Sequence, residues 1–565
     1  MRILLLSHAF NSLTQRLGAE LRQRGHQVSV EFDITDSVTE EAVALFVPDL
    51  IVAPYLRRAI PKSVWSRHVC LIVHPGVVGD RGPSALDWAI DAGLAEWGVT
   101  VLQAEAEMDA GPVWASSNFA LRAAKKASVY RNEVTQAATC AVLQAVERFA
   151  SGGFVPQRPA SSQWQALMKQ ADRAINWQLD DTATVLRKIN AADGFPGVAD
   201  SLFGQTCHLF DACAEATLRG TPGEVIAQRD TALLRATRNG AVWIGHVKRA
   251  NSIKLPATLA FTNELTSVPH AQMPDWWRDQ AATWQDIAYE ETGQVGFLHF
   301  EFYNGAMSTG HCERLRVALA WAKQRPVSVL VLMGGHDFWS NGIHLNVIEA
   351  ASLAGGSAAD ESWRNINAMN DLALELITTD RQITVAALAG STGAGGCFLA
   401  RAADLVWARE AVILNPHYKN MGNLYGSEYW TYLLPRRVGL EAAQAIMHNR
   451  QPLTARRAIQ IGFTDDCLAG DVPAFRAAVA RNAAKLSVTP DLKAQLAIKN
   501  QARTADEAVK PLAAYREEEL AHMRRNFYGF DPSYHVARHH FVHKSPASWT
   551  PRHLAIHREL GWKLP

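Results

Sequence analysis

Two glycine-bearing turns in the second half of the chain have the composition of a site that stabilises a negatively charged oxygen. The first follows an apolar strand expected over Ile383–Ala389, where LAGSTGAGG leads into a helix expected over Gly395–Ala402. A helix that begins on glycine presents bare backbone N–H groups and the positive end of its dipole. The second turn, around Gly342, follows a strand expected over Val327–Met333. Two such turns could supply the two converging N–H donors of an oxyanion hole.

A second group of chemically active residues lies in the first 110 positions. His74 follows a short apolar run, the loop formed by Arg81, Gly82 and Pro83 leads into a helical segment, and Asp109 follows in AEMDAGPVW. An imidazole can stabilise the oxyanion of a tetrahedral intermediate, and a nearby carboxylate can handle the proton of the attacking group. A strand-end histidine bonded to the backbone is the structural alternative.

The elements that position His74 predict an open α/β sheet of the Rossmann-like kind. The helix expected over Ser12–Arg24 is closed by Gly25, and the expected strands are Ile3–Leu6, Val28–Phe32, Leu50–Ala53, Cys70–Val73 and Val99–Ala104. Ligands of such sheets gather beyond the carboxyl ends of the strands. The first turn, SHAFNS, lacks GxGxxG, so a nicotinamide dinucleotide is not expected.

The two glycine turns, in this order and about fifty residues apart, resemble the crotonase (enoyl-CoA hydratase/isomerase) superfamily over roughly residues 286–480. The resemblance implies that the amides of Ile343 and Gly395 bind the thioester carbonyl of an acyl-coenzyme A. Hydratases of this family carry a glutamate where this chain has Phe398, so activation of water by two carboxylates is not expected. Close packing of strand and helix is the alternative reason for the glycines.

The second carboxylate position of the hydratases is also changed. It falls on His417 when counted forward from Pro416 and on Tyr418 when counted back from Gly422, because this segment is one residue longer. A new carboxylate, Glu428, follows in YGSEYW. We expect Tyr418 and Glu428 to divide the acid and base roles, and the sequence does not say which residue takes which. A packed aromatic and a carboxylate at a helix start are the alternative.

The residues around His74 resemble the folate-dependent formyltransferases, including methionyl-tRNA formyltransferase. The resemblance implies that His74 and Asp109 help to move a formyl group from 10-formyltetrahydrofolate, with the Arg81–Pro83 loop at the folate site. The family's third catalytic residue, an asparagine, is Ile72 here. A thiol acceptor would need less assistance, because it ionises more readily than an amine loses its proton.

At 565 residues the chain is too long to fold around a single hydrophobic core, so we expect several domains. With the strand and helix signals, this predicts an α/β multidomain protein. We expect a formyltransferase-like domain over 1–150, a β-barrel-like formyltransferase C-terminal subdomain over 151–270, a crotonase-like domain over 271–485 and a helical extension over 486–565. Asn176–Trp177 and Phe195–Gly197 mark the subdomain, with their apolar side chains expected in its core, and Pro269–Gln280 is the candidate linker. The extension should contain one helix, Ala505–Asn526, broken near Pro511.

Histidines recur at four-residue spacing near the end of the chain. His535, His539 and His543 could share one helix face and bind a metal. No carboxylate or cysteine completes the set nearby, so no metal is expected.

Composition excludes several classes of function. The net charge of +1 gives no electrostatic footprint for nucleic acid or an anionic membrane. The apolar run in MRILLLSHAF is too short for a secretory signal or a membrane span. The seven cysteines lack CxxC spacing, which fits neither a disulfide framework nor a zinc ribbon and favours a reducing cytoplasm.

The chain resembles the HoxX family of hydrogenase maturation proteins over essentially its whole length. The resemblance rests on the fusion of the two halves and on the segment PHYKNMGNLYGSEYW. The resemblance implies formyl transfer to coenzyme A, decarbonylation of formyl-CoA to carbon monoxide, and a role with the NiFe-hydrogenase maturation machinery. Three alternatives remain: a formyltransferase acting on another acceptor, an acyl-CoA hydratase or isomerase, and a non-catalytic carrier of CoA and one-carbon units.

Overall fold

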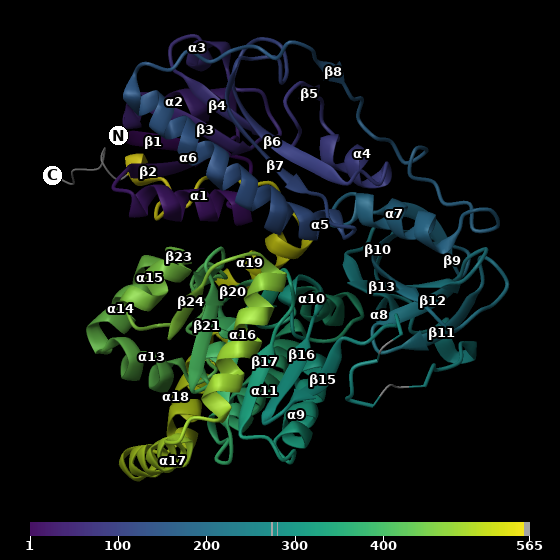
Figure 1. Cartoon of the computed structure of the whole chain (residues 1–565), viewed down its shortest axis with the longest axis vertical. Coiled ribbons are helices and arrows are strands. Elements are labelled where there is room, and N and C mark those ends of the chain that lie inside the picture. The colour runs from purple at the N-terminus through teal and green to yellow at the C-terminus, as the bar shows by residue number, and fades with distance from the viewer. Residues whose placement is uncertain (273–274, 280, 559–565) are drawn as a thin grey trace. The chain divides into compact units, whose positions relative to one another are not determined.

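The computed structural model describes residues 1–272, 275–279 and 281–558, and the chain forms two compact units (Figure 1). The first unit contains Met1–Ala271 together with the C-terminal segment that begins at Pro546. The second unit contains Gln272–Ser545. The division falls within the candidate linker, of which residues 273–274 and 280 lie outside the described part of the chain.

A six-stranded sheet forms the centre of the first unit, in the order β2-β1-β3-β4-β6-β7. The first four strands of this order are parallel, and β6 and β7 are antiparallel to their neighbours. The Rossmann-like prediction is therefore confirmed. The strands are β1 (Arg2–Ser7), β2 (Gln27–Phe32), β3 (Leu50–Tyr55), β4 (Cys70–His74), β6 (Glu96–Gln103) and β7 (Val113–Ala120).

Helices cover both faces of this sheet because alternate strand residues point to opposite sides. On one face Ile3 and Leu5 belong to a buried cluster with residues of α1 (Ser12–Gln23) and α6 (Thr135–Ser151). On the other face Leu4 and Leu6 pack with α2 (Asp36–Phe46). Further helical segments of this part are α3 (Lys62–Trp65), α4 (Ala85–Asp91), α5 (Lys126–Val129) and the π-helical turn η1 (Tyr130–Val134).

The subdomain that follows is a mostly antiparallel sheet in the order β11-β12-β13-β10-β9, with β14 on β13. Trp177 is buried, as expected for a core marker, with the Arg235 guanidinium 4.0 Å from its ring centroid. The expectation for Phe195 is wrong: it is 71% exposed, because it lies in the loop after α7 (Thr182–Ala192). The strands are β9 (Val198–Leu202), β10 (Gln205–Glu215), β11 (Val225–Arg229), β12 (Ala232–Ala236), β13 (Ala241–Arg249) and β14 (Lys254–Pro256).

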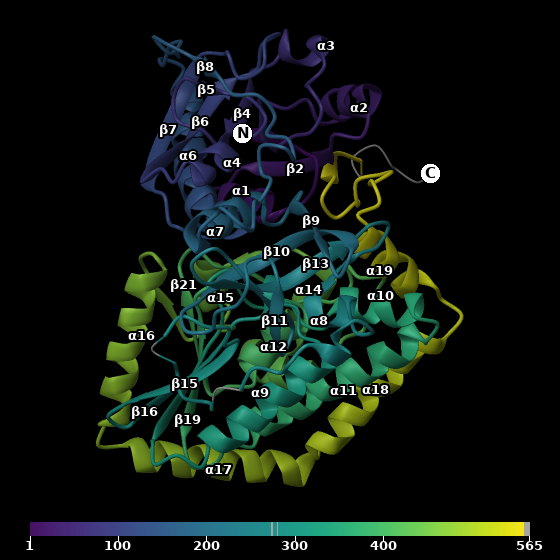
Figure 2. The same cartoon turned by 90° about the vertical axis from the view of Figure 1, so that its right-hand side faces the viewer.

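The second unit has the crotonase fold that the glycine turns predicted. Its main sheet has the order β15-β16-β17-β19-β21-β24, and a smaller sheet has the order β18-β20-β22-β23. Helices α9 and α11 cover one face of the main sheet and α16 covers the other (Figure 2). The elements are β15 (Ile287–Thr292), β16 (Val295–Phe300), β17 (Val329–Met333), β18 (Phe338–Ser340), β19 (Ile383–Leu388), β20 (Ser391–Gly393), β21 (Leu405–Arg409), β22 (Ile413–Asn415), β23 (Leu453–Thr454), β24 (Asp466–Leu468), α9 (Thr309–Ala322), α10 (Leu345–Leu353), α11 (Ala358–Ile377), α12 (Gly395–Arg401), α13 (Trp430–Val438), α14 (Leu440–Asn449), α15 (Ala455–Gln460) and α16 (Val472–Ser487).

The break expected near Pro511 is confirmed, because Pro511 lacks an N–H and disfavours helical geometry at the preceding residue. It separates α17 (Leu492–Val509) from α18 (Leu512–Tyr528), which together extend beyond the expected range of Ala505–Asn526 at both ends. The extension also ends early. After α19 (Ser533–His543) the chain returns to the first unit at residue 546.

The returning segment covers the exposed edge of β2. The N–H groups of Val30 and Phe32 donate to the Leu554 carbonyl and the Thr550 hydroxyl, each at 2.9 Å. An uncovered strand edge is a template for pairing with another chain. The C-terminal segment therefore supplies bonds that a seventh strand would otherwise supply.

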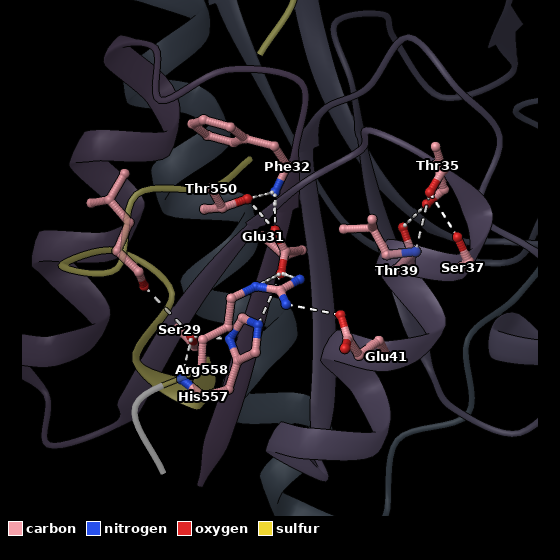
Figure 3. A network of polar contacts seen from close by, with 12 residues as sticks. Ser29, Glu31, Phe32, Thr35, Ser37, Thr39, Glu41, Thr550, His557 and Arg558 are labelled. Atoms are coloured by element: carbon pink, nitrogen blue, oxygen red, sulfur yellow. Dashed lines mark hydrogen bonds and ion pairs between the residues drawn. The ribbon is translucent and has the colours of Figure 1, made fainter. Parts of the chain in front are cut away.

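A buried polar network fixes this segment (Figure 3). His557 lies between Ser29, at 2.6 Å from Nδ1, and Glu31, at 2.9 Å from Nε2. Thr550 and Arg558 also bond to the Glu31 carboxylate. The Ser–His–Glu order matches that of a hydrolase triad, but Ser29, Glu31 and His557 are all fully buried, so the network fastens the segment and does not face a substrate.

No helix in the described ranges is both long and apolar enough to cross a membrane.

Candidate active sites

The first candidate site surrounds His74, the last residue of β4. The imidazole is 4% exposed and lies between two carboxylates. Its Nε2 is 2.7 Å from Asp80 Oδ2, and its Nδ1 is 3.5 Å from Asp109 Oδ2. The structure therefore brings His74 and Asp109 together, as the sequence predicted, and adds a carboxylate on the opposite side of the ring.

Glycines make this arrangement possible. A Cβ atom at Gly76 would lie 2.4 Å from both His74 Nε2 and Asp80 Oδ2, so a side chain there would separate the pair. Gly82 has a φ of +122°, and a Cβ on it would lie 2.0 Å from the Gln165 carbonyl oxygen. The Gly82 N–H donates to Asp109 Oδ2 at 3.2 Å and orients that carboxylate.

The rest of the predicted folate-site loop does not contact His74. The Arg81 guanidinium binds the Met108 carbonyl at 3.0 Å and the Glu107 carboxylate at 2.7 Å, and Pro83 is exposed. Arg81 therefore braces the loop that carries Asp109. Ile72, which replaces the family's asparagine, lies on β4 two residues before His74 and so on the same side of the strand.

Sequence reasoning missed Asp80. Asp80 and Arg81 form the short strand β5, which pairs with β8 (Gln163–Trp164). The sequence feature that could have identified Asp80 is its position, directly before the Arg-Gly-Pro loop and six residues after His74.

The second candidate site contains both predicted glycine turns. Strands β18 and β20 pair in parallel, so the turns that follow them lie at the same edge of the small sheet. A Cβ on Gly342 would lie 3.3 Å from the Gly395 backbone nitrogen. Gly395 is the first residue of α12, a position whose N–H has no acceptor within the helix. The backbone of Ile343 and the start of α12 are thus neighbours, which an oxyanion hole requires.

Glu428 lies directly against this turn. A Cβ on Gly395 would be 2.5 Å from Glu428 Oε1, so only glycine leaves room for the carboxylate. The Tyr418 hydroxyl lies 2.5 Å from Glu428 Oε2 and 2.9 Å from the Ser427 carbonyl. Phe398 stacks on the Tyr418 ring with centroids 5.5 Å apart. Phe398, which replaces the hydratase glutamate, therefore packs against the Tyr418–Glu428 pair.

Burial sets the protonation of this pair. Glu428 is 1% exposed, and burial raises its pKa to about 7. Burial and the neighbouring Glu428 hold the pKa of Tyr418 well above its usual value of 10. Glu428 can therefore gain or lose a proton near neutral pH while the phenol stays protonated. His417 is also buried, but Tyr418 makes the contact with Glu428.

The backbone around Glu428 is strained. Glu428 and Tyr429 have φ values of +58° and +59°, a left-handed geometry that is uncommon for residues other than glycine. The alternative, a carboxylate at a helix start, does not describe Glu428, because α13 begins at Trp430 and the turn holds Glu428 outside it. Strain of this kind persists only where the surroundings impose it.

Two buried side chains impose the turn. Asn370 Oδ1 accepts hydrogen bonds from the Glu428 N–H at 2.7 Å and the Ser427 hydroxyl at 2.6 Å. Glu519 of α18 accepts from the N–H groups of Tyr429 and Thr431, both at 2.9 Å. Burial raises the pKa of Glu519 to about 8. Sequence reasoning missed both residues, which lie 58 and 91 positions from Glu428.

Of the three spaced histidines, only two share a cluster. The ring of His535 bonds to the Phe527 carbonyl at 2.8 Å and to Arg538. Glu349 joins His539 and His543 in the one group of potential metal ligands found among the described residues.

The two folds and their sites define a fusion of a formyltransferase with an enoyl-CoA hydratase/isomerase. Family models agree: a formyl transferase model matches residues 28–146, a formyl transferase C-terminal domain model matches 167–264, and an enoyl-CoA hydratase/isomerase model matches 301–552. A methionyl-tRNA formyltransferase from Paraburkholderia phymatum is 25% identical over 215 residues, which is 37% of this chain and 65% of that protein.

Two relatives match throughout. The hydrogenase maturation factor HoxX of Bradyrhizobium diazoefficiens is 55% identical over 564 residues, covering 99% of this chain and 97% of that protein. The crystal structure of HypX from Aquifex aeolicus in complex with tetrahydrofolic acid superimposes with a TM-score of 0.97 at 48% identity, covering 100% of both chains. The chain belongs to the HoxX family of hydrogenase maturation factors.

Proposed function

We propose that this chain makes carbon monoxide in two steps, for use in maturation of the NiFe-hydrogenase active site. In the first step a formyl group moves from 10-formyltetrahydrofolate to the thiol of coenzyme A. In the second step formyl-CoA loses carbon monoxide and releases coenzyme A. Neither step requires a metal in this scheme.

His74 and its two carboxylates support the first step. The CoA sulfur forms a bond to the formyl carbon, the bond from that carbon to the folate nitrogen breaks, and the thiol proton passes to that nitrogen. In this scheme the imidazole binds the oxyanion of the tetrahedral intermediate, and Asp109 carries the proton. Tetrahydrofolic acid in the related HypX crystal structure supports folate as the donor.

Glu428 and the glycine turns support the second step. The carboxylate removes the proton from the formyl carbon, whose bonding electrons remain there as the lone pair of carbon monoxide. The C–S bond breaks with its electrons on sulfur, and the proton then protonates the thiolate. The Ile343 and Gly395 amides hold the thioester oxygen. Glu428 Oε1 faces Gly395, and Oε2 accepts a hydrogen bond from the Tyr418 hydroxyl. In this scheme Glu428 therefore exchanges the proton, and Tyr418 holds the carboxylate in position.

One observation carries the proposal: the buried Glu428 carboxylate lies directly against the glycine turn at Gly395 and is hydrogen-bonded to the Tyr418 hydroxyl. A single buried proton carrier suits removal and return of one proton. Phe398 replaces one hydratase glutamate and stacks on Tyr418, which disfavours activation of water by two carboxylates.

The test is to incubate the protein with 10-formyltetrahydrofolate and coenzyme A and to follow carbon monoxide by the spectrum of a ferrous haem protein. We expect carbon monoxide only when both substrates are present. Formyl transfer that does not need coenzyme A, turnover of enoyl-CoA without folate, or binding of both ligands without any product would support instead another formyltransferase, a hydratase or isomerase, or a carrier.

A further inference from the structure

A polar cluster joins α10 to α19 within the second unit, apart from the residues assigned to either reaction. His539 and His543 lie one turn apart on α19, with ring centroids 4.1 Å apart. Both approach the same oxygen of Glu349: Oε1 is 3.0 Å from His539 Nδ1 and 3.1 Å from His543 Nε2. The three ligand atoms all lie within 4.8 Å of one another.

These separations are close to those of a metal site. In a tetrahedral zinc site with bonds of about 2.0–2.2 Å, neighbouring ligand atoms lie roughly 3.3–3.5 Å apart. The two nitrogen–oxygen separations differ from that range by only a few tenths of an ångström. Two imidazoles and one carboxylate also match the ligand preferences of zinc and similar divalent transition metals.

The surroundings of Glu349 orient it for this purpose. The buried Arg538 donates from Nε to Glu349 Oε2 at 2.8 Å, which leaves Oε1 facing the two imidazoles. Outer contacts of this kind fix the direction of a ligand carboxylate. The side chains of His539 and His543 are 54% and 32% exposed, so an ion can reach the cluster from solvent.

We propose that Glu349, His539 and His543 bind one divalent transition-metal ion, with zinc as the expected ion and water as the fourth ligand. The ion fastens α19 to α10, the helix that begins two residues after Ile343. The sequence predicted no metal because the completing carboxylate is 190 residues away from His539. The site is independent of the proposed reaction, and its test does not depend on activity.

The test uses cobalt(II) as an optical substitute for zinc in the full chain. Wild type should develop visible absorption of a four-coordinate nitrogen–oxygen site, saturating at one equivalent and reversed by zinc. Thiolate ligation would add a near-ultraviolet charge-transfer band, which separates this site from binding at the free cysteines. His539→Ala and His543→Ala should each weaken binding at least about tenfold. Both side chains are exposed enough for the variants to fold.

His540→Ala is the matched control, because His540 is exposed on the same helix and lies outside the cluster. It should bind cobalt as wild type does. Zinc should raise the melting temperature of wild type and His540→Ala but not of the other two variants. Absence of saturable binding in wild type, or equal binding by all four proteins, would show that the cluster is only an ion pair.

Discussion

Replacement of Glu428 by glutamine should lower the activity of the protein and raise its stability. The amide has nearly the same shape but cannot accept the formyl proton. General acid–base catalysis typically contributes 10²- to 10⁴-fold, so release of carbon monoxide from supplied formyl-CoA should fall by about that factor. The wild-type rate should rise with pH to a plateau above about 7, where the carboxylate is ionised.

The same substitution should stabilise the protein, with a pH dependence of known sign. Burial raises the pKa of Glu428 from 4.5 to about 7, so between these values the folded state binds the extra proton and wild-type stability falls as pH rises. The shift corresponds to about 3 kcal/mol above pH 7. Glu428→Gln avoids this loss, and its melting temperature should exceed that of wild type at pH 8 but not at pH 4.5.

The assays are carbon monoxide capture by a ferrous haem protein, chromatography of CoA products and thermal unfolding across pH. Tyr418→Phe is the comparison variant, because it keeps the carboxylate and removes its neighbour. We expect it also to release less carbon monoxide while formyl-CoA accumulates. A Glu428→Gln protein that releases carbon monoxide at the parent rate would refute the assignment and make His417 the next candidate. A stability difference that does not change with pH would refute the raised pKa.

Further predictions concern the other sites. His74→Ala and Asp109→Ala should abolish formyl transfer from folate and leave release of carbon monoxide from formyl-CoA intact; loss of both activities would contradict two separate sites. Gly395→Val should reduce formyl-CoA turnover by about 3 kcal/mol of transition-state stabilisation, as measured on variant protein shown to be folded by circular dichroism. Glu519→Gln should lower carbon monoxide release about 10- to 100-fold by loosening the turn, with formyl transfer as the unaffected control. His557→Ala should destabilise the first unit by about 3–5 kcal/mol, because a buried carboxylate loses a partner; unchanged denaturant unfolding would refute this.

The sequence predicted local features well because they depend on nearby residues. Apolar runs placed β4, β17 and β19 close to their observed bounds, whereas the short strands β18 and β20, which precede Ile343 and Gly395, were not predicted. His74 and Asp109 lie 35 residues apart, and the resemblance to the formyltransferases predicted that they act together. Strand order alone did not, because β4 and β6 are antiparallel and their carboxyl ends lie at opposite edges of the sheet.

Features that depend on distant contacts were not predictable in this way. Asn370 and Glu519 reach the Glu428 turn from separate helices, and no pattern in either helix marks them. The left-handed geometry of Glu428 follows from these contacts, since the residue type itself favours a helix. Glu349 likewise reaches His539 and His543 only because α10 packs against α19.

The covering of β2 by the last residues of the chain has a consequence for synthesis. Glu31 and Thr550 are 519 residues apart, and at typical elongation rates of 5–20 residues per second the second appears roughly 25–100 s after the first. During that interval the edge of β2 has no cover on the ribosome. The nascent first unit is therefore open to wrong pairing until residues 550–558 have been made, and an interruption of synthesis before them leaves a product with that edge exposed.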